Sequence, residues 1–331
     1  MNLKKSYVLI SFSLSSLQGT LLGYRKLIPA LSGNEEFTLA VGNRMYLQKG
    51  LEPKKKFKNS LKKNFNATAV VTDFSASAAA AKKINGWVEK VTQNKIKDFI
   101  DPKMLGETTK MVLINAIYFK GEWKTKFDLA LTKEKDFLTD KGNTVRVPTM
   151  HMKGKFDIAV LEELKMKVLR LPYKGDRIVM TIILPDDRNG LVVLEQKLEE
   201  LEIGGNTINL INDNISRKEV IVDLPKFKLE QTWKNLKAIL KLMGITTVFN
   251  GGLEGITDGP LVVSDVIQKA LIEVDENGSE AAAASAVGMS FRSNSLAKEI
   301  HFKADHPFFF SLRDTQTGLL LFKGRLGDPS K

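Results

Sequence analysis

The stretch that decides the fold is Asn115-Ala116-Ile117-Tyr118-Phe119-Lys120-Gly121-Glu122-Trp123. It continues a run of apolar and β-branched residues that begins at Met111, and such a run is typical of a strand in a buried sheet. Similar runs predict five further strands, at 37–47, 167–171, 178–184, 219–224 and 319–322. The turn signal Lys174-Gly175-Asp176 separates two of these strands.

Helices are predicted among the strands. One helix carries an apolar stripe at helical spacing, formed by Ile84, Trp87, Val88 and Val91. A second helix is expected over 231–243, with Met243 on its buried side. Helices and strands mix without a repeating βαβ alternation, which favours an α+β fold over a doubly wound parallel sheet. Because no long polar linker divides the chain, we expect one domain.

Composition narrows the class of protein. The 331 residues include no Cys, which excludes disulfides, a thiolate nucleophile and a Cys-based zinc site. No run of eighteen or more apolar residues exists, so we predict no membrane-spanning helix and no membrane partner. Residues 1–15 combine a basic start with a short apolar stretch, which fits either a secretion signal or an amphipathic first helix.

The net charge of +12 favours acidic partners. Six lysines crowd one segment, and they form either a polyanion-binding patch or a solvated helix face: Lys54, Lys55, Lys56, Lys58, Lys62 and Lys63. A sulfated polysaccharide would be such a polyanion. No nucleic-acid-binding motif accompanies the lysines, so nucleic acid is not expected as a partner.

Enzyme chemistry finds little support in the sequence. The three histidines, His151, His301 and His306, have no zinc-ligand spacing. The segment 288–292 fails the last position of a nucleophile elbow, and no phosphate-binding glycine motif occurs. We therefore expect no catalytic residue, metal or cofactor, and a binding or inhibitory protein becomes more plausible than an enzyme.

Five motifs in order resemble the serpin family of serine protease inhibitors. They are 115–123, Leu171-Pro172-Tyr173-Lys174-Gly175, Leu224-Pro225-Lys226-Phe227, 276–284, and Asp305-His306-Pro307-Phe308-Phe309-Phe310. The resemblance covers 21–331 and implies an α+β fold with mainly antiparallel sheets, surrounding helices and an exposed reactive-centre loop at about 276–297. Residues 1–20 do not match, so we expect a signal peptide or replaced exon there, and the family's first helices to be missing.

The resemblance also implies a reactive centre and a hinge. Counting from Glu276, the seventeenth residue is Arg292, which would form the scissile bond with Ser293. A guanidinium pairs with the carboxylate in the specificity pocket of trypsin-like proteases. A register shifted by one residue would instead present Phe291 to a chymotrypsin-like enzyme. The hinge residues are Glu276, Gly278, Ser279, Glu280, Ala281, Ala282, Ala283 and Ala284.

Residues that control sheet opening are implied as well. Asn115 would hydrogen-bond to Gln268, a position where the family usually has His. Lys226 would pair with Glu276 and, together with Trp123, close the entry point of the loop. After cleavage, the loop would insert into the main sheet as a new strand.

Several alternatives remain open at this stage. The chain is a monomeric inhibitor of a trypsin-like protease, a non-inhibitory serpin, or an inactive, N-terminally truncated one. Glycosylation sequons at Asn66, Asn214 and Asn277 favour a secreted, extracellular glycoprotein, with a cytoplasmic protein as the alternative. A glycan at Asn277 would lie in the hinge and obstruct insertion.

Overall fold

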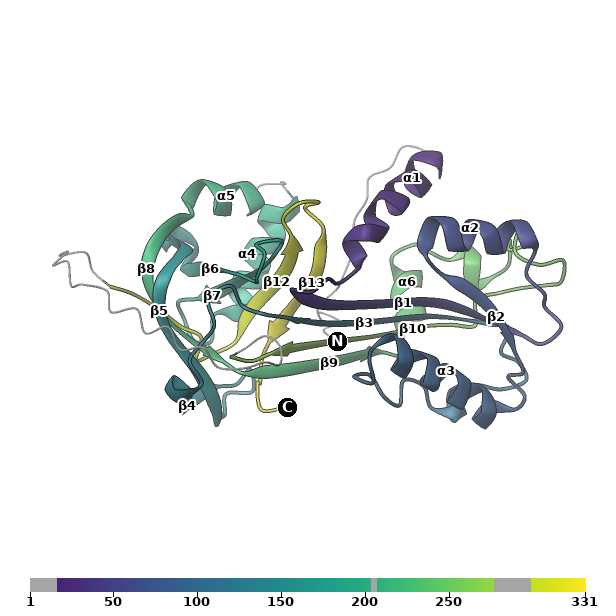
Figure 1. Cartoon of the computed structure of the whole chain (residues 1–331), viewed down its shortest axis with the longest axis horizontal. Helices are drawn as coiled ribbons and strands as arrows, with labels where there is room; N and C mark the ends of the chain where they lie inside the picture. The colour runs from purple at the N-terminus through teal and green to yellow at the C-terminus, as the bar shows by residue number, and fades with distance from the viewer. Residues whose placement is uncertain (1–16, 204–206, 277–298) are drawn as a thin grey trace. The chain divides into compact units, whose positions relative to one another are not determined.

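The structure is a computed structural model that describes residues 17–203, 207–276 and 299–331. The chain forms two compact units (Figure 1). Over the described residues, the first unit comprises 121–203, 207–228, 273–276 and 299–331, and the second comprises 17–120 and 229–272. The chain passes between the units several times, so no single linker separates them. For this reason the composition of the sequence does not mark a boundary between the units.

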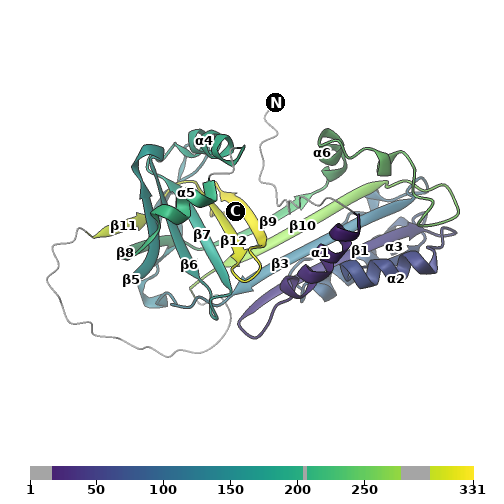
Figure 2. The ribbon, with the colours of Figure 1, turned by 90° about the horizontal axis from the view of Figure 1, so that it is seen from above.

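The second unit is built on a five-stranded sheet with the order β2-β1-β3-β10-β9. Figure 2 shows β1, β3 and β10 as long neighbouring strands. The strands are β1 (Phe37–Gln48), β2 (Thr68–Thr72), β3 (Met111–Gly121), β9 (Phe227–Trp233) and β10 (Asp265–Val274). The helices are α1 (Leu17–Leu27), α2 (Lys55–Phe65), α3 (Ser77–Val91) and α6 (Leu236–Leu242). The pairs β1–β2 and β3–β10 are both parallel.

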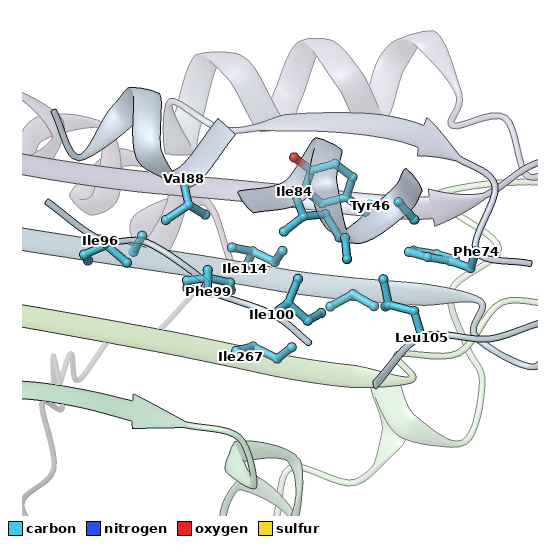
Figure 3. Packing of buried hydrophobic residues seen from close by; sticks show 14 of the residues in the cluster. Tyr46, Phe74, Ile84, Val88, Ile96, Phe99, Ile100, Leu105, Ile114 and Ile267 are labelled. Atoms are coloured by element: carbon cyan, nitrogen blue, oxygen red, sulfur yellow. The ribbon is translucent and has the colours of Figure 1, made fainter. Parts of the chain in front are cut away.

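Helix α3 covers one face of this sheet. Its stripe residues Ile84 and Val88 are fully buried and point towards Ile114 of β3 and Ile267 of β10 (Figure 3). The segment after α3 packs into the same cluster through Ile96, Phe99 and Ile100. A second cluster, formed around Leu47 and Met111, receives Phe57 of α2 and Leu240 of α6. The apolar stripe read from the sequence is therefore a core-facing surface.

The first unit contains an eight-stranded sheet. Its strands are β4 (Lys133–Leu138), β5 (Thr144–Leu161), β6 (Met166–Pro172), β7 (Ile178–Pro185), β8 (Ser216–Pro225), β11 (Ile300–Lys303), β12 (Phe308–Asp314) and β13 (Leu320–Leu326). The order is β11-β8-β5-β6-β7-β12-β13, with β4 paired to β5, and among the described residues every pair except β11–β8 is antiparallel. Helices α4 (Leu191–Ile203) and α5 (Thr207–Asn214) complete the unit. The α+β class with mainly antiparallel pairing is confirmed.

One predicted helix is wrong at its start. Residues 231–233 belong to strand β9, which is hydrogen-bonded to β10, and α6 begins only at Leu236. Pairing with a neighbouring strand outweighs the local helical pattern there. Met243, expected on the buried side, is 49% exposed. The predicted turn at Lys174-Gly175-Asp176 is present, with positive φ angles at Gly175 and Asp176.

Candidate functional site

The start of the predicted hinge is held by a buried carboxylate in the first unit. Glu276 lies two residues after the end of β10 and is only 3% exposed. Lys226, just after β8, pairs with its Oε2 at 2.8 Å, and the hydroxyl of Thr132 donates to its Oε1 at 2.8 Å. The backbone N–H of Phe127 donates to the carbonyl of Glu276 at 3.2 Å. These four residues form what we call the hinge clasp.

The clasp keeps Glu276 ionised. Burial by itself would raise the pKa of the carboxyl, but hydrogen bonds from Lys226, from its own backbone N–H and from Thr132 outweigh burial. The pKa therefore lies below the ordinary value of 4.5. Because both oxygens of the carboxylate have donors, the charge at the beginning of the loop is compensated.

Trp123 fixes the residue immediately before the clasp. Its indole Nε1–H donates to the carbonyl of Asp275 at 2.8 Å. The ring stacks on Tyr173 with 4.2 Å between centroids, packs edge-on against Phe127, and is 2% exposed. An aromatic pair of this kind adds about 0.5–1.5 kcal/mol beyond area burial. Trp123 and the predicted pair Lys226–Glu276 are thus brought together around 275–276.

A chain of amides crosses strands β10, β3 and β1 of the second unit. Gln268 is in register with Asn115, and its side-chain NH₂ donates to Asn115 Oδ1 at 2.8 Å. Asn115 in turn donates to Oδ1 of Asn43 on β1, also at 2.8 Å. The predicted Asn115–Gln268 contact exists, and Gln at position 268 makes it without a titratable group.

The residue after Gln268 links β10 to other segments of the second unit. Lys269 is 6% exposed, pairs with Glu230 of β9 and donates to the carbonyl of Lys97 at 3.0 Å. Lys97 lies in the segment after α3, between the buried Ile96 and Phe99. Side chains therefore bridge β10 to its surroundings at two consecutive residues, whose side chains point to opposite faces of the strand.

The six clustered lysines lie on and just before α2. Lys54 pairs with Asp258 at 2.6 Å. The other five are exposed, and within the described part of the chain they form no ion pair: Lys55, Lys56, Lys58, Lys62 and Lys63. The second unit as a whole contains 22 Lys and Arg against 12 Asp and Glu, so it carries most of the net positive charge of the chain, +10 of +12.

The rest of the predicted site lies outside the described residues. This applies to the reactive-centre residues Phe291, Arg292 and Ser293, to the sequon residue Asn277, and to the hinge residues Gly278, Ser279, Glu280, Ala281, Ala282, Ala283 and Ala284. Among the residues that the structure does describe, no three His, Asp or Glu side chains converge as metal ligands. Likewise, none of the described helices is long and apolar enough to cross a membrane.

Sequence reasoning missed three members of the site. Thr132 and Phe127 join the clasp, and Asn43 extends the amide chain. Thr132 is separated from Glu276 by 144 residues and Asn43 from Asn115 by 72, so only the folded arrangement brings them together. No motif in the sequence marks either residue.

Comparisons with known proteins agree with this architecture. The family model described as "Serpin (serine protease inhibitor)" matches residues 6–329, so the match begins inside the segment 1–20, where the motifs showed no likeness. Antichymotrypsin-2 of Bombyx mori is 38% identical over 289 residues, which cover 86% of this chain and 75% of that protein.

Solved structures show the same likeness. The crystal structure of Serpin48 from Tenebrio molitor has a TM-score of 0.81 and 33% identity, covering 95% of this chain and 82% of that one. Native protease nexin-1 with heparin has a TM-score of 0.81 and 29% identity, covering 95% and 84%. Together with the motifs, the two mixed sheets and the clasp around Glu276, these matches show that the chain belongs to the serpin family of serine protease inhibitors.

Proposed function

We propose that the chain is a suicide-substrate inhibitor of trypsin-like serine proteases, cleaved between Arg292 and Ser293. Arg292 would enter the specificity pocket and form bidentate hydrogen bonds to the carboxylate at its base. Cleavage would free the segment after Glu276 to enter the five-stranded sheet while the protease is still attached as an acyl-enzyme. The trapped enzyme would then be unable to complete hydrolysis.

The observation that carries the proposal is the parallel pairing of β3 with β10. The two strands are in register from Asp265 opposite Val112 to Ile272 opposite Phe119. The loop follows β10 directly, so a loop that folds back between β3 and β10 runs antiparallel to both. Insertion would replace one parallel ladder with two antiparallel ladders, and parallel pairing is slightly less stable per residue.

The composition of the loop suits such a strand. Alternation places Ser279, Ala281, Ala283, Ser285 and Val287 on one face, which would turn inward on insertion, and every one of them is small and uncharged. About a dozen inserted residues, at roughly 1 kcal/mol net per hydrogen bond, give a gain on the order of 10 kcal/mol. A free-energy gain of this size can offset the cost of distorting the protease active site. Distortion slows hydrolysis of the acyl-enzyme strongly, since losing one oxyanion-hole donor slows the reaction about 10²–10³-fold.

Incubation with trypsin tests the proposal. An inhibitor gives a covalent complex that survives a denaturing gel, and Arg292→Ala abolishes that complex. Arg217→Ala is the matched control, because Arg217 is an exposed arginine whose nearest carboxylate, on Asp157, is 3.6 Å away. Simple cleavage at Arg292 without a covalent complex would assign the chain to the non-inhibitory serpins. A covalent complex with chymotrypsin that Arg292→Ala retains and Phe291→Ala loses would move the scissile bond by one residue.

A second pair of variants tests insertion separately. Ala281→Arg places a charged side chain on the face predicted to turn inward, whereas Ala282→Arg places it on the opposite face. We expect Ala281→Arg to be cut by trypsin as a substrate and Ala282→Arg to retain the covalent complex. Because both variants introduce a new arginine, cleavage at positions 281 and 282 has to be excluded by mass spectrometry. Equal trapping by the two variants would contradict insertion.

Polyanion binding is a second candidate function, and the five exposed lysines of α2 favour it. They lie on a helix without an acidic residue, in the unit that carries most of the net positive charge. A solved serpin of the same fold was crystallised with heparin, which makes a sulfated polysaccharide a reasonable ligand class. Attraction of this kind weakens as salt screens the charges.

Heparin chromatography distinguishes a binding patch from a solvated helix face. Replacing the five lysines of α2 with alanine should lower the salt concentration needed for elution. Replacing Lys82, Lys83 and Lys90, three exposed lysines of α3, is the control for net charge alone. If the salt concentration needed for elution falls by the same amount per replaced lysine in both variants, α2 is not a specific polyanion site.

A further inference from the structure

The C-terminal end of α6 exposes three apolar side chains within four residues. Leu242 is 76% exposed, Met243 49% and Ile245 46%. We call residues 241–245 the α6 tip. In Figure 2, α6 stands to one side of β3 and β10.

The tip has a fixed shape. Gly244 has a φ of +89°, a conformation that closes helices and favours glycine. Its N–H donates to the carbonyl of Lys241 at 3.0 Å, and the N–H of Ile245 donates to the carbonyl of Leu240 at 3.0 Å. Leu240 itself packs against the core cluster around Leu47. The helix is thus anchored by Leu240 and presents Leu242 to solvent.

Basic residues accompany the apolar tip along the chain. The segment 231–250 contains Lys234, Lys237 and Lys241 and no Asp or Glu. Lys237 donates to the carbonyl of Ser264 at 2.9 Å and, like Lys241, lies over the ring of Phe249 at less than 6 Å. The unit that contains the tip has ten more basic than acidic residues, 22 against 12.

We propose that the α6 tip inserts into the surface of an anionic lipid bilayer. Leu242, Met243 and Ile245 would enter the boundary between headgroups and acyl chains, and the neighbouring lysines would lie among anionic headgroups. Such a contact is peripheral, so the absence of a long apolar run in the sequence does not argue against it. It is independent of protease inhibition, because the tip includes none of the clasp or loop residues.

Charge complementarity selects a bilayer over a second copy of the chain. Another copy would bring its own basic unit against the tip, and like charges oppose such an interface. Several other exposed apolar side chains lie next to acidic residues: Leu129 is 65% exposed and follows Asp128, while Val192 and Val193 are 58% and 56% exposed and precede Glu195. Leu22 of α1 is 48% exposed and lies near Arg25 and Lys26, but it is a single apolar side chain. Among the described residues, the α6 tip is where three exposed apolar side chains occur within four residues beside lysines.

Vesicle sedimentation with the full chain tests the proposal. We expect binding to vesicles that contain phosphatidylserine, little binding to phosphatidylcholine alone, and weaker binding as salt rises. Leu242→Glu should lower the partition coefficient about tenfold or more, since full burial of one leucine corresponds to at least that factor. Leu129→Glu is the matched control and should bind as the unaltered chain does.

Two further measurements complete the test. The thermal unfolding midpoint of Leu242→Glu should equal that of Leu129→Glu, because both side chains are exposed. Light scattering without vesicles should show a monomer. Equal vesicle binding by the two variants, absence of binding to phosphatidylserine vesicles, or a dimer that depends on Leu242 would each overturn the proposal.

Discussion

Lys226→Ala removes the cation from the hinge clasp and leaves Glu276 buried with fewer donors. Hydrogen bonds to a charged group contribute about 1.5–3 kcal/mol to stability. The Lys226–Glu276 distance of 2.8 Å is that of such a charge-assisted hydrogen bond. The clasp would stabilise the native state but not the loop-inserted state, so the substitution would raise the free energy of the native state alone. We therefore expect spontaneous insertion, and with it loss of inhibition, to accelerate by about 10- to 150-fold, since each 1.4 kcal/mol is tenfold.

The assay is residual trypsin inhibition after timed incubation at 37 °C, followed by the thermal midpoint of the inactivated material. Inactivated Lys226→Ala should be more heat-resistant than the fresh protein, because it has gained a strand. Lys153→Ala is the matched control: Lys153 also forms ion pairs, with Glu219 at 2.9 Å and Glu299 at 2.7 Å, but none with the clasp. If both variants lose inhibition at the same rate, the clasp does not control entry of the loop.

Three other predictions follow from the same contacts. The lowered pKa of Glu276 stabilises the native state above the ordinary Glu value of 4.5, and this contribution disappears as pH falls through the lower folded value. Spontaneous loss of inhibition, measured against pH, should therefore be flat from pH 8 to 5 and rise only below about 4.5, whereas a Glu276→Gln variant should lack this rise. Gln268→Leu removes the 2.8 Å hydrogen bond to Asn115 and should lower stability by about 1 kcal/mol, measured as a thermal midpoint about 2 °C lower. An unchanged midpoint would show that the amide chain does not stabilise the sheet. Asn66 and Asn214 are exposed, so if the chain is secreted from eukaryotic cells, peptide N-glycosidase should lower its mass, and mutation of these two sequons together with Asn277 should abolish the change.

Much of the fold could be read from the sequence because its strands are rich in apolar and β-branched residues. The strand predicted at 111–119, which is β3, and the stripe on α3 were identified because local pattern and burial agree there. Strand β10 escaped notice because Gln268 and Lys269 interrupt its apolar pattern. Both polar side chains are satisfied by partners on other elements, which local periodicity does not reveal.

The candidate site was also only partly predictable from the sequence. The pairing of Lys226 with Glu276 was implied by a family resemblance, and the geometry agrees with it. Thr132 could not be found, since a threonine in a short connection has no distinguishing pattern and its partner is remote in sequence. The extension of β9 to Trp233, inside a predicted helix, has a similar cause, because a hydrogen-bonded neighbouring strand overrides local preference.

Heat resistance before and after a single cut between Arg292 and Ser293 is the decisive observation for an inhibitor of this kind. Insertion of a strand worth on the order of 10 kcal/mol should raise the unfolding midpoint by about 20 °C or more. A midpoint that stays the same or falls after the cut would contradict loop insertion in this chain.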